Sequence, residues 1–160
     1  MDDSLSSLDI RILEQIQQDC SLSTSDLAEK VGSSQSPCWR RLQRLHDSGY
    51  IAREVAVLNH SKFQPSFFIF ATLKVSTLSE QQREEFTRKL DLTSEILECY
   101  TIFGERDVLI KVIAPSMDWY QKFVFKTLMK LPGVIDVQST LAVAELKYTT
   151  AIPVRGERVL

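Results

Sequence analysis

The residues best suited to chemistry in this chain form one short, arginine-rich segment. It reads Ser-Pro-Cys-Trp-Arg-Arg-Leu-Gln-Arg-Leu over residues 36–45. Arginine and glutamine can each make a pair of hydrogen bonds to a base edge, arginine to guanine and glutamine to adenine. At about 100° per residue, a helix with Cys38, Leu42 and Leu45 inside presents a polar set on its other side: Ser36, Arg40, Gln43 and Arg44. The segment therefore predicts a helix face that reads bases in the major groove of DNA.

Four neighbouring residues are suited to hold the DNA backbone or to start the helix beside it. Arg41 and Arg53 flank the polar face, and we expect them to bind phosphates, which fix the register of a protein on DNA without reading its sequence. Ser34 and Gln35 stand at the expected beginning of the helix and complete the candidate DNA contacts.

A helix, a tight turn and a second, basic helix are expected to position these residues. Gly32 separates two helical patterns and can adopt the positive φ that ends a helix. We expect one helix over about 24–31, with Ser23 and Asp26 at capping-box spacing, and the next over about 35–47. This is the layout of a helix-turn-helix DNA reader.

Two further caps follow from the same segment and from the residues before it. Ser34 offers a side-chain oxygen to cap the basic helix, and Pro37 is tolerated in its first turn. A preceding helix is expected to begin after Asp9 as its N-cap, with Ile12, Leu13 and Ile16 along its apolar stripe.

The pattern changes after Gly49. Residues 50–58 alternate well enough to predict a strand leading out of the helical part, and residues 59–65 indicate a connection. We therefore place a winged helix-turn-helix DNA-binding domain at 1–52, a linker strand and connection at 53–65, and a second domain at 66–160.

The second domain shows the order strand, helix, strand, strand, helix, strand. Strands are expected at 66–75, 96–103, 108–114 and 134–143, and the helices follow the capping serines Ser79 and Ser116, the later helix reaching Leu131. This order is the βαββαβ arrangement of ferredoxin-like folds, in the α+β class. Because the strands are apolar on both sides, we expect the sheet face without helices to be buried by dimerisation.

Composition favours a cytoplasmic binding protein over an enzyme or a membrane protein. The formal net charge is −2 over 160 residues. No stretch approaches the roughly 20 apolar residues of a membrane span, and the N-terminus lacks the features of a secretory signal. Three scattered cysteines fit neither a disulfide framework nor a zinc site. The chain contains only two histidines and no nucleophile motif, so we expect no catalytic residue, no metal and no cofactor.

Several short motifs, in this order along the chain, carry a resemblance to a known family. The chain resembles the Lrp/AsnC (feast/famine) family of bacterial and archaeal transcription regulators over about residues 8–153. The resemblance implies an N-terminal winged helix-turn-helix and a C-terminal ferredoxin-like amino-acid-sensing domain. It also implies homodimers that often assemble into octamers, and transcription that responds to a free amino acid. The motifs are Asp9-Ile10-Arg11-Ile12-Leu13, Leu27-Ala28-Glu29-Lys30-Val31-Gly32, Ser36-Pro37-Cys38-Trp39-Arg40-Arg41-Leu42, Gly104-x-x-Asp107, Leu131-Pro132-Gly133-Val134 and Lys147-Tyr148-Thr149-Thr150.

In that family the effector binds between sensing domains of neighbouring subunits, around the Gly-x-x-Asp turn and the facing strand. Turn amides suit the carboxylate of an amino acid, and Asp107 suits its ammonium group. The residues alone leave open a plain β-turn that Gly104 permits and Asp107 stabilises. The resemblance implies these candidate effector contacts: Thr101, Phe103, Gly104, Asp107, Ser139 and Thr140.

The chain departs from the family pattern inside this turn. Members often carry an aromatic residue just before the aspartate, where this chain has Arg106. Members with similar Pro-Cys-Trp and Lys-Tyr-Thr-Thr motifs include regulators that respond to cysteine or to aliphatic amino acids. The resemblance therefore implies cysteine or an aliphatic amino acid as the effector.

Two alternatives compete with DNA reading. A basic helix face can simply be solvated, and a winged helix can bind protein on an oligomeric scaffold without binding DNA. Protein-binding winged helices tend to expose apolar residues on the third helix, whereas this one offers Arg40, Gln43 and Arg44. Trp39 and His46 lie at the edge of the apolar stripe, where we expect packing rather than base contact.

Overall fold

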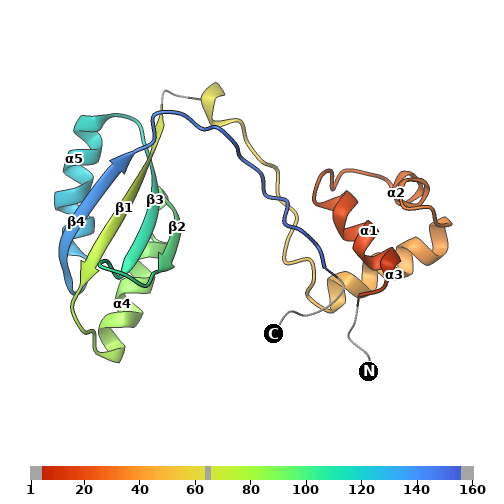
Figure 1. Cartoon of the computed structure of the whole chain (residues 1–160), viewed down its shortest axis with the longest axis horizontal. Helices are drawn as coiled ribbons and strands as arrows, with labels where there is room; N and C mark the ends of the chain where they lie inside the picture. The colour runs from red at the N-terminus through yellow and green to blue at the C-terminus, as the bar shows by residue number, and fades with distance from the viewer. Residues whose placement is uncertain (1–4, 64–65, 156–160) are drawn as a thin grey trace. The chain divides into compact units, whose positions relative to one another are not determined.

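The computed structural model describes residues 5–63 and 66–155, which divide into two compact units (Figure 1). The first unit takes the chain up to Val57 together with the segment from Lys147 on, and the second runs from Leu58 to Leu146. Each unit has its own hydrophobic core. The first is helical and the second mixes strands and helices, which confirms the predicted α+β class.

The first unit contains the predicted helix pair and the helix before it. They are α1 (Ser7–Ile16), α2 (Thr24–Lys30) and α3 (Gln35–Asp47). Gly32, just after α2, has a φ of 66°, which confirms the predicted turn. On α3 the apolar stripe is confirmed, since Cys38 and Leu45 are fully buried and Leu42 packs against them. The buried core of the unit consists of Ile12, Leu13, Leu27, Ala28, Val31, Cys38 and Leu45.

The start of α1 differs from the prediction, which was wrong to make Asp9 the N-cap. Ser6 is the N-cap, and Asp9 is the third helical residue of a complete capping box. The backbone N–H of Ser6 donates to Asp9 Oδ2 at 2.8 Å, and that of Asp9 donates to Ser6 Oγ at 3.2 Å. The spacing Ser-x-x-Asp satisfies two otherwise unpaired amides at once, which a lone N-cap cannot do.

The caps of α2 and α3 also differ in detail. Ser23 Oγ accepts from the Asp26 amide at 3.1 Å as expected, but its hydroxyl also donates to the Asp26 carboxylate at 2.6 Å. Ser34 is the N-cap of α3 yet makes no side-chain capping bond, so that prediction was wrong. The reason is Pro37, which occupies the third helical position and has no N–H to donate. Only the amide of Ser36 is left at the positions that an N-cap side chain binds.

The predicted strand over 50–58 is absent from the described chain. After α3 the backbone continues without a helix or a strand as far as Asn59. Alternating residues make a strand only where a neighbouring chain supplies ladder hydrogen bonds, and among the described residues this segment has no such ladder.

The C-terminal segment belongs to the first unit rather than to the sheet. The side chain of Gln17, the C-cap residue of α1, forms two hydrogen bonds with the backbone of Ile152. Gln17 Nε2 donates to the Ile152 carbonyl, and the Ile152 amide donates to Gln17 Oε1, each at 2.9 Å. Val154 packs against the core of the helices. The sequence placed these residues in the second domain because its pattern shows nothing of this contact.

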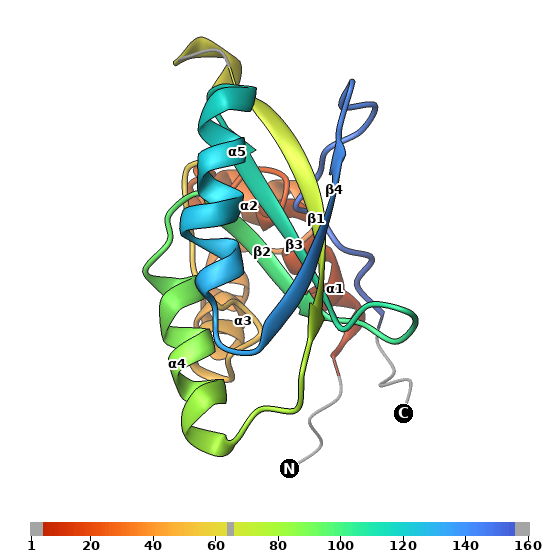
Figure 2. The same cartoon turned by 90° about the vertical axis from the view of Figure 1, so that its left-hand side faces the viewer.

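The second unit is the predicted βαββαβ fold. Its antiparallel sheet has the order β2-β3-β1-β4, as in ferredoxin-like folds (Figure 2). The predicted capping serines are confirmed, because Ser79 accepts from the Gln82 amide and Ser116 from the Trp119 amide. In chain order the elements are β1 (Phe67–Val75), α4 (Glu80–Asp91), β2 (Ile96–Thr101), β3 (Val108–Ala114), α5 (Met117–Lys126) and β4 (Val134–Leu141).

Three elements end earlier than the sequence predicts. β2 stops at Thr101 rather than 103, because the next amide, of Ile102, bonds to the carbonyl of Asp107 and begins a turn. β4 stops at Leu141 rather than 143. The later helix ends at Lys126, and its predicted remainder is a short 3₁₀ helix over Leu128–Lys130.

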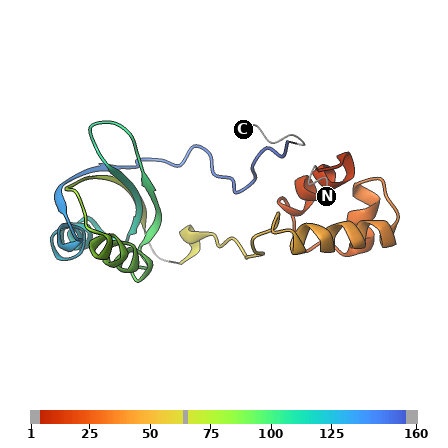
Figure 3. The same ribbon diagram turned by 90° about the horizontal axis from the view of Figure 1, so that it is seen from below.

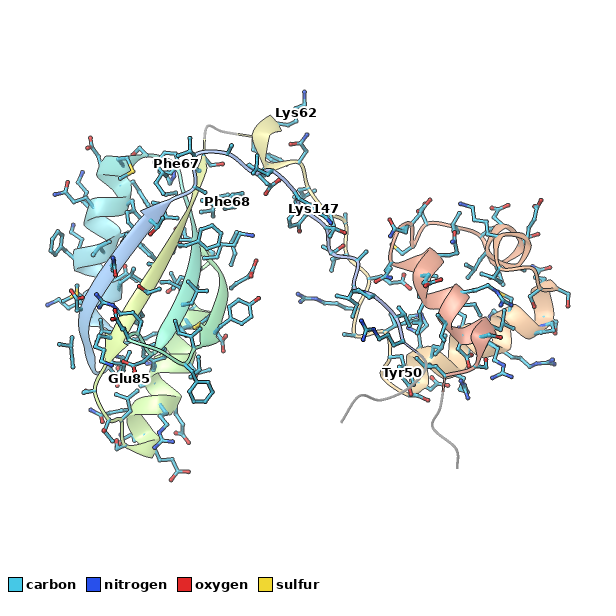
Figure 4. The ribbon with its side chains drawn as sticks, in the orientation of Figure 1. Tyr50, Lys62, Phe67, Phe68, Glu85 and Lys147 are labelled. Carbon is cyan, nitrogen blue, oxygen red and sulfur yellow. The ribbon has the colours of Figure 1, made fainter. Side chains whose placement is uncertain are left out.

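Both helices of the second unit lie on one face of the sheet (Figures 2 and 3). Neighbouring residues on β1 therefore meet different surroundings: Phe67 packs against the core, and Phe68 points the other way, with the Lys111 ammonium 4.9 Å from its ring centre (Figure 4). The face without helices is part apolar, with the Phe70 side chain 40% exposed and Tyr100 53% exposed.

The loop before β4 depends on a glycine. Gly133 has a φ of 71°, its carbonyl accepts from the Ser76 amide at 2.8 Å, and an added Cβ would lie 2.3 Å from Leu78 Cδ2. We expect Gly133→Ala to lower the free energy of unfolding of this unit by about 2 kcal/mol, through backbone strain and overpacking. Thermal unfolding followed by circular dichroism measures the loss.

Gly49→Ala is the matched control. Its φ of 72° is nearly the same, but no atom lies within 4 Å of an added Cβ. It should lose only the strain component, about 1 kcal/mol. Equal losses in the two variants would show that the contact with Leu78 contributes nothing.

Candidate functional site

The polar face of α3 is exposed as predicted. Ser36, Arg40 and Gln43 are all exposed, and so are Ser34 and Gln35 at the start of the helix. Arg40 takes part in none of the ion pairs found among the described residues. Its guanidinium is therefore available to an external acceptor.

Two other arginines of α3 are engaged by a buried carboxylate of α1. Arg44 Nη2 lies 2.7 Å from Asp9 Oδ2, and Arg41 Nη1 lies 3.4 Å from the same oxygen. The Asp9 side chain is fully buried, while each arginine side chain is 42% exposed. Asp9 therefore binds both guanidiniums on their buried side, and their outer edges are still exposed to solvent.

The Asp9 carboxylate is bonded unevenly. Oδ2 accepts from the Ser6 amide, the Ser6 hydroxyl and the two arginines. Oδ1 is buried with no hydrogen-bond partner among the described residues. Burial opposes ionisation of Asp9, but the hydrogen bonds from Ser6 and the charges of Arg44 and Arg41 prevail and lower its pKa below the ordinary value of 3.8.

Sequence reasoning missed this role of Asp9. The Ser-x-x-Asp spacing was available as a capping-box signal, but the arginine contacts span more than thirty positions of sequence. No local pattern predicts which arginine of an amphipathic helix meets a carboxylate on another helix.

Three other residues considered for DNA contact or packing around α3 form no ion pair with Asp9 among the described residues. Arg53 is exposed in the segment after the helix. His46 is half-buried, with Nε2 3.4 Å from Glu54 Oε1. Trp39 does not join the core as expected, because its side chain is 52% exposed.

The Gly-x-x-Asp turn is held to the end of β1 by its aspartate. Asp107 Oδ2 accepts from the Val75 amide at 2.8 Å, and Oδ1 accepts from Lys74 Nζ at 3.2 Å. The bond from the Val75 amide and the charge of Lys74 lower the pKa of this carboxyl group. Gly104 has a φ of 144°, which few other residues adopt.

Arg106, which precedes Asp107 in this turn, crosses to the last strand. Its guanidinium pairs with the carboxylate of Asp136, and Nη2 donates to Gln138 Oε1 at 3.3 Å. The hydrogen bond and the charge of Arg106 lower the pKa of Asp136. The turn is thus tied to β1 by Asp107 and to β4 by Arg106.

The other effector candidates do not converge on one face. Ser139 stands opposite Ala71, on the helix-covered side, and its hydroxyl is 2.7 Å from the Tyr120 hydroxyl. Thr140 stands opposite Phe70 on the side without helices. Thr101 is exposed at the end of β2, and the Phe103 side chain projects fully into solvent. The structure therefore gathers Gly104 and Asp107 in one turn but separates Ser139 from Thr140.

The described part of the chain has neither a helix suited to cross a membrane nor a cluster suited to hold a metal ion. None of the helices there is long and apolar enough to cross a bilayer. Within the same residues, no cluster of three or more histidine, cysteine or acidic side chains is arranged to hold a metal ion.

Comparisons with known proteins match both units. Residues 5–52 match the family model of a winged helix-turn-helix DNA-binding domain, and residues 69–152 match that of the Lrp/AsnC ligand binding domain. The chain is 34% identical over 150 residues to the DNA-binding transcriptional activator DecR of Escherichia coli K12, covering 94% of this chain and 99% of the relative.

Two further relatives cover nearly the whole chain. The leucine-responsive regulatory protein of Escherichia coli K12 is 30% identical over 151 residues, which cover 94% of this chain and 92% of the relative. A transcriptional regulator of Neisseria meningitidis, solved as a complex with L-Met, has a TM-score of 0.88 and 32% identity, over 94% of this chain and 97% of that one.

The contacts of Asp9 are expected to stabilise the helical unit. Asp9→Asn should lower the free energy of unfolding of the helical unit by about 1–3 kcal/mol at neutral pH, because it removes charge-assisted bonds from Ser6, Arg41 and Arg44. Folding lowers the pKa of Asp9, so its contribution is complete well above pH 3.8 and is lost as the pH falls below that value.

Denaturant unfolding at pH 7 and near pH 3 measures the loss of stability and its pH dependence. The difference in the free energy of unfolding between the native chain and Asp9→Asn should be smaller in acid. Asp47→Asn, at an exposed carboxylate of the same unit, is the control and should change stability little. A gap of constant size at both values would contradict the ionic role of Asp9.

Proposed function

Because the chain belongs to the Lrp/AsnC family of transcription regulators, we propose that it binds specific DNA sequences and regulates transcription in response to a free amino acid. The exposed polar face of α3 carries this proposal. It combines the guanidinium of Arg40, which forms no ion pair among the described residues, with the amide of Gln43 and the hydroxyl of Ser36. These groups match the donors and acceptors of base edges in the major groove.

The DNA contacts divide into two sets. Arg40, Gln43 and Ser36 are the proposed base readers. Because Asp9 holds Arg44 and Arg41 at the side of the helix, these two arginines are better placed for phosphates than for a base edge. Arg53, Ser34 and Gln35 complete the proposed backbone contacts.

The proposed effector site lies around the Gly104–Asp107 turn. A carboxylate offers about four acceptor positions, and Asp107 uses two, on Val75 and Lys74. An ammonium group can therefore still bind it, while turn amides receive the carboxylate of the ligand. Thr101, Phe103, Ser139 and Thr140 are more distant candidates, and the facing wall belongs to a neighbouring subunit. The Neisseria relative with bound L-Met supports an amino acid as ligand, with cysteine or an aliphatic side chain as its proposed identity.

Assembly is part of the proposal. The sheet face without helices exposes much of Phe70 and Tyr100, and a second copy of the chain can cover it. We propose a homodimer that assembles further to an octamer and acts in the cytoplasm, with no catalytic role and no cofactor. An effector bound between subunits changes DNA binding only by favouring one assembly or dimer spacing over another.

Replacing Arg40 tests the proposal that α3 reads bases of DNA. Arg40→Ala should cost about 1–3 kcal/mol of binding to the preferred sequence, because a bidentate base contact is lost, and should cost far less on random DNA. Electrophoretic mobility shift titrations at one fixed salt concentration measure both. Lys126→Ala, at a cation of the second unit, is the control; an equal loss on both DNAs would remove Arg40 from the base readers.

Replacing the turn aspartate tests the effector proposal. Asn keeps an oxygen for the Val75 amide but loses the charge, so Asp107→Asn should fold normally, bind DNA and lose its amino-acid response. Thermal-shift titration with the free amino acids measures ligand binding, since a ligand of the folded state raises the apparent stability. Asp118→Asn, which removes an exposed carboxylate of the same unit outside the turn, is the control. A full response in Asp107→Asn would move the site elsewhere.

A further inference from the structure

An exposed tryptophan stands within the polar face of α3. The Trp39 side chain is 52% exposed, whereas the preceding residue, Cys38, is completely buried. Among the described residues, Trp39 makes no hydrogen bond or ring contact. Its indole is therefore a large apolar surface left to solvent beside the base-reading groups.

Helix geometry sets the neighbours of this indole. Residues three and four positions apart are adjacent on a helix surface, so Trp39 lies between Ser36 and Gln43. Arg40 borders the same exposed face. Arg44 turns toward Asp9 instead and leaves this side of the helix. The exposed face thus combines hydrogen-bonding groups with one flat apolar group.

The major groove contains a matching partner. Its base edges are polar except for the 5-methyl group of thymine, which apolar side chains contact. We propose that Trp39 determines sequence specificity by packing its indole against a thymine methyl group next to the bases bound by Arg40 and Gln43. This inference rests on the proposed function, because it requires α3 to enter the major groove.

Deoxyuridine is the sharpest probe of this contact, since it differs from thymidine only by that methyl group. The full chain is first used to select a preferred duplex from random DNA, and each thymine is then replaced singly by uracil. Native protein should lose about fourfold in affinity at one or two positions, the value of burying one such group. Trp39→Ala should bind the thymine duplex more weakly and show no further loss with uracil there.

Gln43→Ala is the matched control on the same helix face and should keep the uracil effect. The inference is overturned if uracil never weakens binding, or if Trp39→Ala remains as sensitive to uracil as the native chain. Either result leaves sequence-specific binding intact. Failure to select any preferred duplex would overturn the proposed function as well.

Fluorescence gives a second readout that needs no substitution at position 39. The chain has two tryptophans, and Trp119 stacks on Phe123 in the second unit. In Trp119→Phe, Trp39 is the sole indole. Acrylamide should quench it readily in free protein and much less once the selected duplex is bound. Protection before DNA is added would show that a protein surface covers Trp39, and would overturn the inference in favour of a protein-binding face.

Discussion

A buried negative charge between two helices is the interaction on which the DNA-reading unit depends. Asp9 is sealed from solvent, and ionising it there is favourable only because Ser6, Arg41 and Arg44 bind the same oxygen. Breaking such a pair from one side leaves a charge without compensation, so the contact ties α1 to α3 in one arrangement. The position of α3 on the unit is fixed by this bond together with the packing of Cys38 and Leu45.

The same contact separates the three arginines of α3 into two that bind Asp9 and one that does not. Two guanidiniums are oriented by Asp9 and present only their outer edges, which suits a phosphate group. The third, Arg40, forms no ion pair within the part of the chain that the structure describes, so it stays available to an external acceptor. A helix with three free arginines would bind DNA mainly through charge, and hence with little dependence on sequence. Under the proposed function, anchoring two of them leaves sequence discrimination to Arg40, Gln43, Ser36 and the exposed indole of Trp39.

The second unit is built around a sheet that helices cover on one face only. Its helices bury one side, and the Gly104–Asp107 turn is fastened to the strands on both flanks. Under the proposed function, a turn fixed in this way loses little conformational entropy when a ligand binds. The chain joins the two units twice, through residues 52–58 and again through the segment after Leu146, which is held at Gln17. The proposed change of assembly in the second unit would therefore have two covalent routes to the first.

The sequence by itself determined the elements and the family. Periodicity located α2, α3 and the six elements of the second unit, because local burial and capping depend on residues only a few positions apart. Periodicity could not predict contacts between residues that lie far apart in the sequence. Tertiary structure decided the partners of Asp9, the contact of Ile152 with Gln17 and the exposure of Trp39. It also left residues 50–58 without a ladder to any described strand. Each depends on which distant surfaces meet, and a buried charge, an unpaired backbone or a free indole is recognised only once those surfaces are in place.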